Sequence, residues 1–387
     1  MADYLHGVKI LEVNDGTRTV RTVATAIIGI VCTGDDADSE TFPLNKAILT
    51  TNPQSLMGKA GTTGTLYRTL EAISNIVRAP TVIIRVPEDE EELTANVIGK
   101  INEDGKGTGL KALLSAQSSL GVKPRILACP GLDNLEVTTA LVATAKKLHG
   151  FAYAHCVADT KEEAIEYRRN FGDRELMLIY GDFESYNVHK TAVDTAYATA
   201  SAVGLRAWAD KEIGWHRNIS NLSIPGVSGV TKAISFDIQD ESTDANFLNS
   251  KEVSCAIRFG GFKIWGARTT STDSLFAFEQ YTRTAQVIRD TIGDAYDWAI
   301  DKPLTPGLVK DMLEMINAKM REWKAQGYIV DGEAWVDFDE NTKETIKDGK
   351  FRIRYKYCPM PSLENLELRQ YITDEYLADF AAKITQA

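Results

Sequence analysis

The sequence has few cysteines, and none of them lie close together. The five cysteines are odd in number and contain no C-x-x-C pair. A disulfide framework or a structural zinc site would need closely spaced or paired cysteines, so the pattern favours neither. We therefore expect small buried hydrophobic side chains at Cys32, Cys129, Cys156, Cys255 and Cys358.

The sequence also lacks a long hydrophobic run. Its longest nearly apolar stretch, Val23–Cys32, is about half of the ~20 residues that a membrane helix needs. The first residues, Met-Ala-Asp-Tyr, have neither the basic region nor the apolar region of a secretory signal. We expect a soluble protein that is made in the cytoplasm and has no membrane partner.

Positive charge is in deficit, with 43 Lys and Arg residues against 54 Asp and Glu residues and a formal net charge of −11. A general affinity for nucleic acid or for an anionic membrane requires a basic face. The charge balance therefore predicts no nucleic-acid partner, although it leaves room for a local basic patch.

Complete catalytic and ligand-binding motifs are missing. Gly58-Lys59 lacks the flanking residues of a phosphate loop, and Ser228 lacks the second glycine of a nucleophile elbow. Residues 107–112 match the dinucleotide fingerprint, but no buried strand precedes them. The five histidines show no metal-binding spacing. We predict that the protein is not an enzyme and has no cofactor, metal site or catalytic residue.

What the sequence does contain is ordinary globular material, 387 residues of which 44% are hydrophobic. That length predicts two or three domains. The pattern along the chain divides it into an N-terminal arm (1–20), a small mixed, mostly β outer domain (21–104), an α/β domain (105–280), a C-terminal α+β inner domain (281–361) and a C-terminal arm (362–387).

The outer domain is predicted from Thr-, Val- and Ile-rich runs and one helix over Thr65–Arg78. It closes at Pro87–Glu92, where five successive carboxylates repel one another. We expect a solvated loop there and regard a metal site as the weaker alternative.

The α/β domain is predicted from apolar strands over Arg125–Cys129, Phe151–Val157 and Glu175–Tyr180 that alternate with helices. One helix spans 134–148, and a capping box from Thr160 to Glu163 begins the next.

The inner domain begins with two long helices, over about 275–300 and 306–326. Two alternating strands follow, Glu333–Asp339 and Lys350–Tyr357. They are predicted to pair as a hairpin with an apolar face on the helices and opposite charges on the other face. The apolar residues are Val336, Phe338, Phe351, Ile353 and Tyr355, and the charge pairs come from Asp337, Asp339, Arg352 and Arg354. A nucleic-acid role for the basic strand is the weaker alternative, because its acidic partner already explains the cations.

Two further alternating segments lack an obvious partner, and they lie near the two ends of the chain. The first contains Val8, Ile10 and Val13, and the second contains Leu366, Leu368 and Ile372, beyond the stiff Pro359-Met-Pro361 spacer. A two-stranded hairpin has two open edges, which invite further strands. We predict that the terminal segments add to hairpins.

Several short motifs recur in a fixed order along the chain: His6-Gly-Val8 with Thr17–Val20, Thr108–Leu113, Pro124–Gly131, Gly226–Gly229, Leu248-Asn249, Ile264–Asp273 and Gln326-Gly327. With these motifs the sequence resembles, nearly end to end, the tail sheath proteins of contractile-tailed bacteriophages. The similarity is greatest to the short sheaths of temperate myophages and of R-type bacteriocins.

This resemblance implies a subtilisin-like α/β domain without a protease triad, a C-terminal domain beside the inner tail tube, and arms that add strands to neighbouring subunits. The expected function is a subunit that polymerises helically around the tube and contracts, in a virion tail or a bacteriocin particle. Its expected partners are other copies, the tube, the baseplate and the tail terminator. The proposed tube-facing residues are Lys319, Arg321 and Lys324. The alternatives are a sheath of a secretion or injection apparatus and, less favoured, an α/β hydrolase or nucleotide-binding enzyme.

Overall fold

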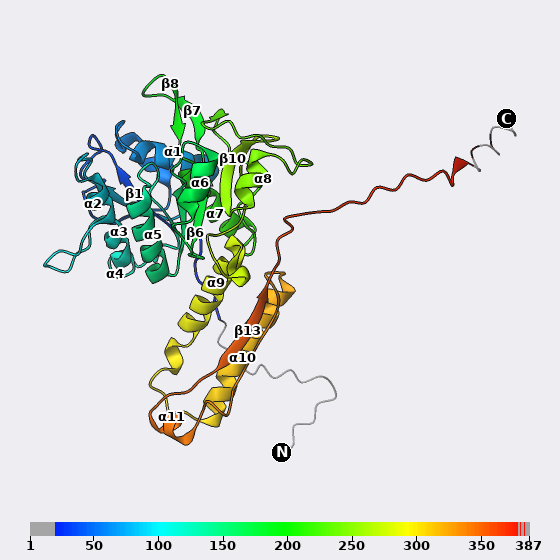
Figure 1. The fold of residues 1–387 in the computed structure, drawn as a ribbon. Coiled ribbons are helices and arrows are strands. Elements are labelled where there is room, and N and C mark those ends of the chain that lie inside the picture. Colours follow the sequence, from blue (N-terminus) through cyan, green and yellow to red (C-terminus); the bar gives the residue numbers. More distant parts are fainter. Residues whose placement is uncertain (1–19, 378–379, 381–382, 384–387) are drawn as a thin grey trace, which may run out of the picture.

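The structure, a computed structural model, describes residues 20–377, 380 and 383. Figure 1 shows an α/β body, an elongated C-terminal domain below it, and a terminal segment that extends away from both. The predicted N-terminal strand with Val8, Ile10 and Val13 lies outside the described residues.

An eight-stranded sheet forms the centre of the body, in the order β11-β10-β6-β5-β4-β1-β3-β2. The six central strands are parallel, and an antiparallel strand closes each edge. Its strands are β1 (Ile28–Thr33), β2 (Ile48–Thr50), β3 (Thr81–Val86), β4 (Ile126–Ala128), β5 (Phe151–His155), β6 (Leu176–Tyr180), β10 (Val253–Arg258) and β11 (Phe262–Trp265).

Helices cover both faces of the sheet, which makes three layers. One face packs on α2 (Leu93–Ile98), α3 (Gly109–Ala112), α4 (Ala116–Leu120), α5 (Leu135–Leu148), α6 (Lys161–Arg168) and α8 (Asp244–Asn249). The other face packs on α1 (Leu66–Ile76) and α7 (Ala198–Glu212). Along β1 the side chains alternate between the two cores, as strand geometry requires: Ile30 joins the α1/α7 core and Val31 joins the α5 core.

The predicted outer domain over 21–104 does not form a sheet of its own. Its strands β1 and β3 lie inside the eight-stranded sheet, where β1 pairs with both β3 and β4. The physical reason is that β1 and β3 are buried along their whole length, as strands covered on both faces are. The predicted boundary near residue 104 therefore separates segments that share one core.

The elements predicted between residues 125 and 180 are present. β4, β5 and β6 occupy the three predicted strand segments, with their ends one or two residues shorter. The capping box at Thr160 is formed with both of its hydrogen bonds, and helix α5 ends with His149 in the left-handed conformation at φ 54°. None of the described helices combines the length and apolar character needed to cross a membrane.

A small three-stranded sheet projects from the body on the side away from the C-terminal domain (Figure 1). It has the order β8-β7-β9. Its strands are β7 (Phe183–Asn187), β8 (Ala192–Ala196) and β9 (Gly229–Val230).

The C-terminal domain contains both predicted long helices, as α9 (Glu279–Ala295) and α10 (Pro306–Ala325). Thr305 caps α10 through its side-chain oxygen, and Pro306 occupies the first turn. β12 (Ile329–Trp335) and β13 (Arg354–Pro359) form an antiparallel pair, and α11 (Lys343–Lys347) lies in the loop between them.

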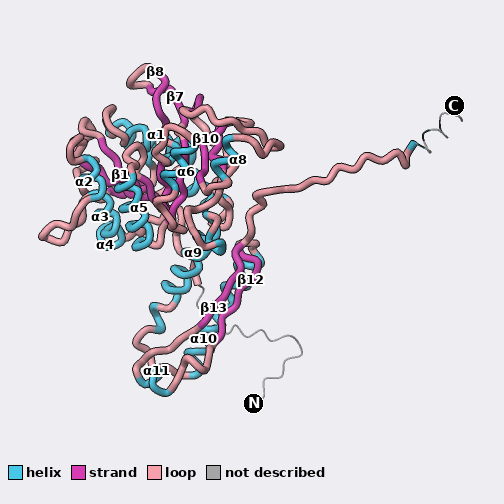
Figure 2. Tube along the Cα trace, in the orientation of Figure 1, coloured by secondary structure: helices cyan, strands magenta, loops and turns pink. Residues whose placement is uncertain are grey.

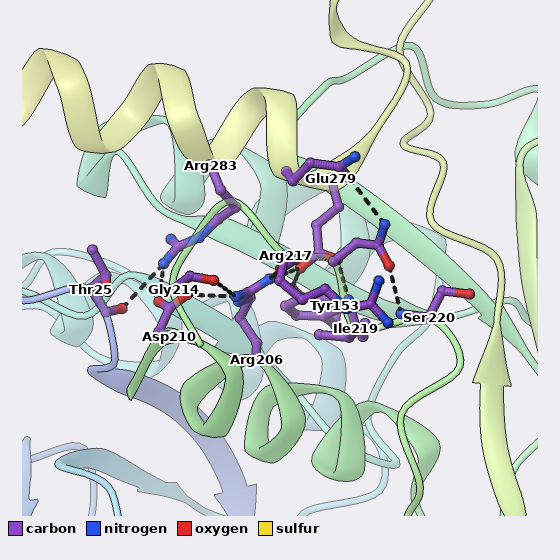
Figure 3. A network of polar contacts seen from close by, with 12 residues as sticks. Thr25, Tyr153, Arg206, Asp210, Gly214, Arg217, Ile219, Ser220, Glu279 and Arg283 are labelled. Carbon is purple, nitrogen blue, oxygen red and sulfur yellow. Dashed lines mark hydrogen bonds and ion pairs between the residues drawn. The ribbon is translucent and has the colours of Figure 1, made fainter. Parts of the chain in front are cut away.

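Helix α9 joins the two parts of the molecule, because a buried charge network holds its first turns against the body (Figure 3). Arg206 of α7 lies 2.7 Å from Asp210 and 3.1 Å from Glu279, and Arg283 lies 2.5 Å from Asp210. All four side chains are at most 1% exposed. Burial alone would lower the pKa of Arg206, but the carboxylates of Asp210 and Glu279 raise it above its ordinary value.

Four of the five cysteines are buried, as predicted. Burial raises the pKa of the thiols of Cys32, Cys156 and Cys255 to about 12. Cys358 was predicted to be buried and is exposed, because it lies on the outer face of the two-stranded sheet.

Candidate assembly surface

The hairpin of the C-terminal domain is the candidate assembly surface. Its first strand begins and ends earlier in the chain than the sequence predicts. β12 begins at Ile329 and ends at Trp335, before the predicted strand is complete. Gly332 lies within β12 and close to α10, where a Cβ would be 2.8 Å from the sulfur of Met320. The strand therefore packs where glycine allows close approach to α10.

This shift moves most of the predicted apolar residues out of the strands. Val336, Phe338, Phe351 and Ile353 lie in the connection between β12 and β13, so the prediction that they belong to the ladder is wrong. Phe338 is 84% exposed. Tyr355 is in β13 as predicted, directly opposite Ala334.

The hairpin has ion pairs between acidic and basic side chains, but they include residues that were not among the predicted charge pairs. Arg354 lies 2.9 Å from Asp337 and 2.7 Å from Glu340, whose hydrogen bond raises the pKa of Arg354. Lys356 lies 2.7 Å from Glu333, its cross-strand neighbour.

Arg352 and Asp339, the other two residues predicted to form charge pairs, make main-chain contacts instead. Arg352 donates to the main-chain carbonyl of Glu340, and the main-chain N–H of Asp339 donates to Asp337. They lie in the irregular connection, so the ladder does not bring them face to face. The cations of β13 are nevertheless balanced by carboxylates of this chain, which accounts for the basic stripe.

The structure changes the view of the proposed tube-facing residues on α10. Lys319 is only 6% exposed, lies 2.9 Å from Glu322 and packs over the ring of Trp323, so it is no part of a solvent-facing polar surface. Its aliphatic chain joins the core of the domain, as long cationic side chains often do. Arg321 and Lys324 are exposed and paired with Glu314 and Asp331.

The C-terminal arm leaves the hairpin after Pro359 and is held to the body at its root. The side-chain amide of Asn218 donates to Ser362 at 2.9 Å. Arg268 donates to both carboxylate oxygens of Glu364, at 2.9 and 2.5 Å, and packs over Phe278.

Beyond this root the arm is extended and solvent-exposed. Leu366, Leu368 and Ile372 are 64%, 82% and 96% exposed. Figure 2 shows this segment as loop, and no strand in the described part of the chain pairs with it. Exposed alternating apolar residues of this kind are typical of a segment that is covered by a partner.

Charge reversal at Arg354 tests the local role of its ion pairs. We expect Arg354→Glu to speed amide hydrogen exchange in β13, because it places a third carboxylate beside Asp337 and Glu340. Lys350→Glu is the matched control, because among the described residues Lys350 forms an ion pair only with Asp348 in the connection. Equal exchange in both variants would contradict this role.

No cluster of His, Cys, Asp or Glu side chains suited to a metal ion is found among residues 20–377 and the two others described. Sequence reasoning missed Asn218, Arg268 and Glu364 at the root of the arm. Arg268 lies in the Ile264–Asp273 motif, but the polar character of Asn218 and Glu364 is shared by most exposed residues and did not indicate these contacts.

Comparison with known protein families gives three consecutive matches. Residues 25–86 match "Tail sheath protein Gp18 domain III N-terminal region", residues 105–270 match "Phage tail sheath protein central domain", and residues 271–373 match "Phage tail sheath C-terminal domain". The first two of these segments share one sheet.

Two curated relatives match nearly end to end. The tail sheath protein of Escherichia phage P2 is 50% identical over 99% of both chains. The major tail sheath protein of Serratia phage KSP20 is 41% identical over 97% of this chain and 96% of its own length.

Solved structures share the fold at lower identity. The helical sheath of the anti-feeding prophage in its contracted state has a TM-score of 0.71 at 18% identity, over 97% of this chain and 100% of that chain. The contracted sheath complex of the extracellular contractile injection system PVC has a TM-score of 0.72 at 16% identity, over 97% and 99% of the two chains.

Proposed function

Because the chain belongs to the phage tail sheath family, we propose that it polymerises helically around a tail tube and contracts to drive that tube through the envelope of a target cell. The observation that carries the proposal is an open two-stranded sheet in the same molecule as an extended, exposed arm. Main-chain hydrogen bonds between arm and sheet of different copies would join many identical subunits. Such a contact joins unlike surfaces, so it need not close into a ring.

Contraction, in this proposal, releases energy stored during assembly. Subunits first form an extended lattice that a barrier keeps from rearranging, and a signal from the baseplate lets them rotate and move outward into a lattice of lower free energy. The arms keep the subunits connected while the bodies repack. No nucleotide hydrolysis is required, and we assign the chain no enzymatic role.

The other partners follow from the family. They are the tail tube, which the C-terminal domain faces, and the baseplate and tail terminator at the two ends of the sheath. Assembly takes place in the host cytoplasm, and the product is a virion tail or a bacteriocin particle. The six parallel strands of the body support the subtilisin-like arrangement that the resemblance implies.

A second context is a sheath of an injection apparatus. The likeness to the anti-feeding prophage and PVC sheaths favours it as an alternative, because the mechanics are the same and only the attached particle differs.

Negative-stain microscopy of the purified chain tests the proposal. We expect long striated tubes at high protein concentration, because each copy supplies both an arm and an acceptor sheet. Uniform monomers across the whole concentration range would contradict it.

A further inference from the structure

A pocket of about 470 Å³ lies where helix α9 meets the edge of the body sheet at which the parallel strands begin. Its charged lining comes from Lys123 and Arg125, just before β4, and from Arg289, Asp290 and Asp294 of α9. Arg125 is 8% exposed, and its Nε has no hydrogen-bond partner in the described part of the chain. The lining thus has three cations against two carboxylates.

Within this pocket Lys123 is the cation that its own subunit does not pair. The carboxylate of Asp290 forms an ion pair with Arg125 and lies 2.7 Å from Nδ1 of His149. Lys123 forms no ion pair with any described residue. Burial and the guanidinium of Arg125 lower the pKa of Lys123, and the carboxylates of Asp290 and Asp294 offset only part of this effect. The pocket therefore favours a further carboxylate beside Lys123.

Exposed carboxylates gather at the opposite edge of the same sheet. The acidic segment, Glu88–Glu92, follows β3 after one residue, and Asp89–Glu92 are exposed before α2. No residue of this segment forms an ion pair within the described chain. The main-chain N–H of Glu88 donates to Asp35 at 3.4 Å, and burial, together with the charges of Asp35 and Asp36, raises the pKa of Glu88. A cation beside this segment would relieve the repulsion.

The pocket and the acidic segment cannot meet within one subunit. Ile28 of β1 stands opposite both Thr81 and Ile126, so β3 and β4 begin at the same level of the sheet. The six residues of β3 then carry the chain about 20 Å away before the acidic segment begins. Two copies can bring these surfaces together if the acidic edge of one faces the basic edge of the next. Such a contact joins unlike surfaces, so it can repeat in one direction.

We propose that the acidic segment of one subunit docks into the Lys123 pocket of a second copy, where Lys123 and Arg289 bind its carboxylates. This inference rests on the proposed function and adds a charge contact between the bodies of two subunits. Opposite charges at the two edges also favour one relative orientation during encounter. Because α9 forms one wall of the pocket, the docked segment touches the helix that joins the body to the C-terminal domain.

Zero-length coupling tests the contact directly. A carbodiimide joins a lysine to a carboxylate only where the two side chains touch. Tubes are assembled from isotope-labelled and unlabelled chains, coupled and digested, and the linked peptides are identified by mass spectrometry. We expect Lys123 to be linked to the acidic segment in peptide pairs of mixed label, and this link to be absent from monomers. Lys356 and Glu333, 2.7 Å apart, are the internal control that couples within one chain.

Two results would overturn the inference while leaving the proposed function intact. The first is tubes in which Lys356 couples to Glu333 but Lys123 does not couple to the acidic segment of another copy. The second is coupling of Lys123 to Glu12 or Asp15 instead, which would make residues 1–19 the occupant of the pocket. An unaltered chain that forms no tubes would overturn the proposed function, and the inference with it.

Exchange of the charges is a second measurement. We expect Lys123→Glu to raise the protein concentration at which half of the chain is in tubes by about tenfold. Adding Glu90→Lys and Glu91→Lys to this variant should reverse most of the loss, because the charges are then exchanged. Lys347→Glu is the matched control, since Lys347 is exposed in α11, at the far end of the C-terminal domain (Figure 1).

Circular dichroism of the soluble fraction checks that each of these variants is folded. The same loss of tubes in Lys123→Glu and Lys347→Glu would contradict a specific contact at Lys123. A folded triple variant that assembles no better than Lys123→Glu would contradict the acidic segment as its partner.

Discussion

We expect a chain that ends at Pro361 to stay folded and monomeric and to form no tubes. Among its described residues, the deleted segment binds its own body at Ser362 and Glu364. Partly exposed ion pairs of this kind contribute about 1 kcal/mol or less to stability. The same deletion removes every main-chain hydrogen bond that the arm would give to another copy. The measurements are thermal unfolding, sedimentation and negative-stain microscopy at matched concentrations.

A second deletion and a point variant are compared with this truncation. Removing Met1–Asn14 is expected to abolish tubes as well, because both terminal segments are predicted to add strands. Lys347→Ala, an exposed change in α11, is expected to leave tube formation intact. The strand-exchange proposal would be wrong if either truncated chain still polymerised.

Arg206→Met is expected to lower the free energy of unfolding by about 3–5 kcal/mol, the usual cost of removing one partner of a buried ion pair. The methionine fills much of the space, but Glu279 loses its cation while Asp210 keeps only Arg283. Tyr153 and the main-chain N–H of Ile219 still donate to Glu279, but they bring no charge. Urea unfolding followed by tryptophan fluorescence measures the loss.

Two further variants separate charge from packing. Lys211→Met changes an exposed residue of the same helix, 3.3 Å from Glu212, and should change stability by no more than about 0.5 kcal/mol. Adding Glu279→Gln to Arg206→Met restores neutrality in the network, so the double variant should be more stable than Arg206→Met alone. If Arg206→Met and Lys211→Met cost the same, the network does not hold the junction.

The strands and helices between residues 125 and 180 could be predicted because each carries its own local signal. Buried strands such as Leu176–Tyr180 are continuous apolar runs, and the helix at Thr160 begins with a capping box. The place of β1 in the sheet could not be predicted in the same way. Which strand it pairs with depends on contacts nearly a hundred residues away, such as Ile28 with Ile126.

The sequence predicted a hairpin of two oppositely charged strands, but it did not predict the bounds of the strands or the contacts of individual side chains. Alternation located two strands of opposite charge, but it did not indicate that β12 begins at Ile329 and includes Gly332, which packs close to Met320. Lys319 was predicted to lie on the polar side of its helix, yet it packs on Trp323. Asn317 of α10 hydrogen-bonds both main-chain groups of Ala334, a contact that a single asparagine in a helix does not indicate in the sequence.

The anchoring of α9 has a mechanical consequence. Its 17 residues make a rod about 25 Å long whose first turns are fixed in the body and whose far end joins the C-terminal domain. A tilt of the body by about 10° therefore carries the far end of a 25 Å helix sideways by about 4 Å, nearly the spacing between two strands of a sheet. Because the buried charges fix one end of α9 in the body, a small rotation of the body displaces the other end of the helix by about the spacing between two strands.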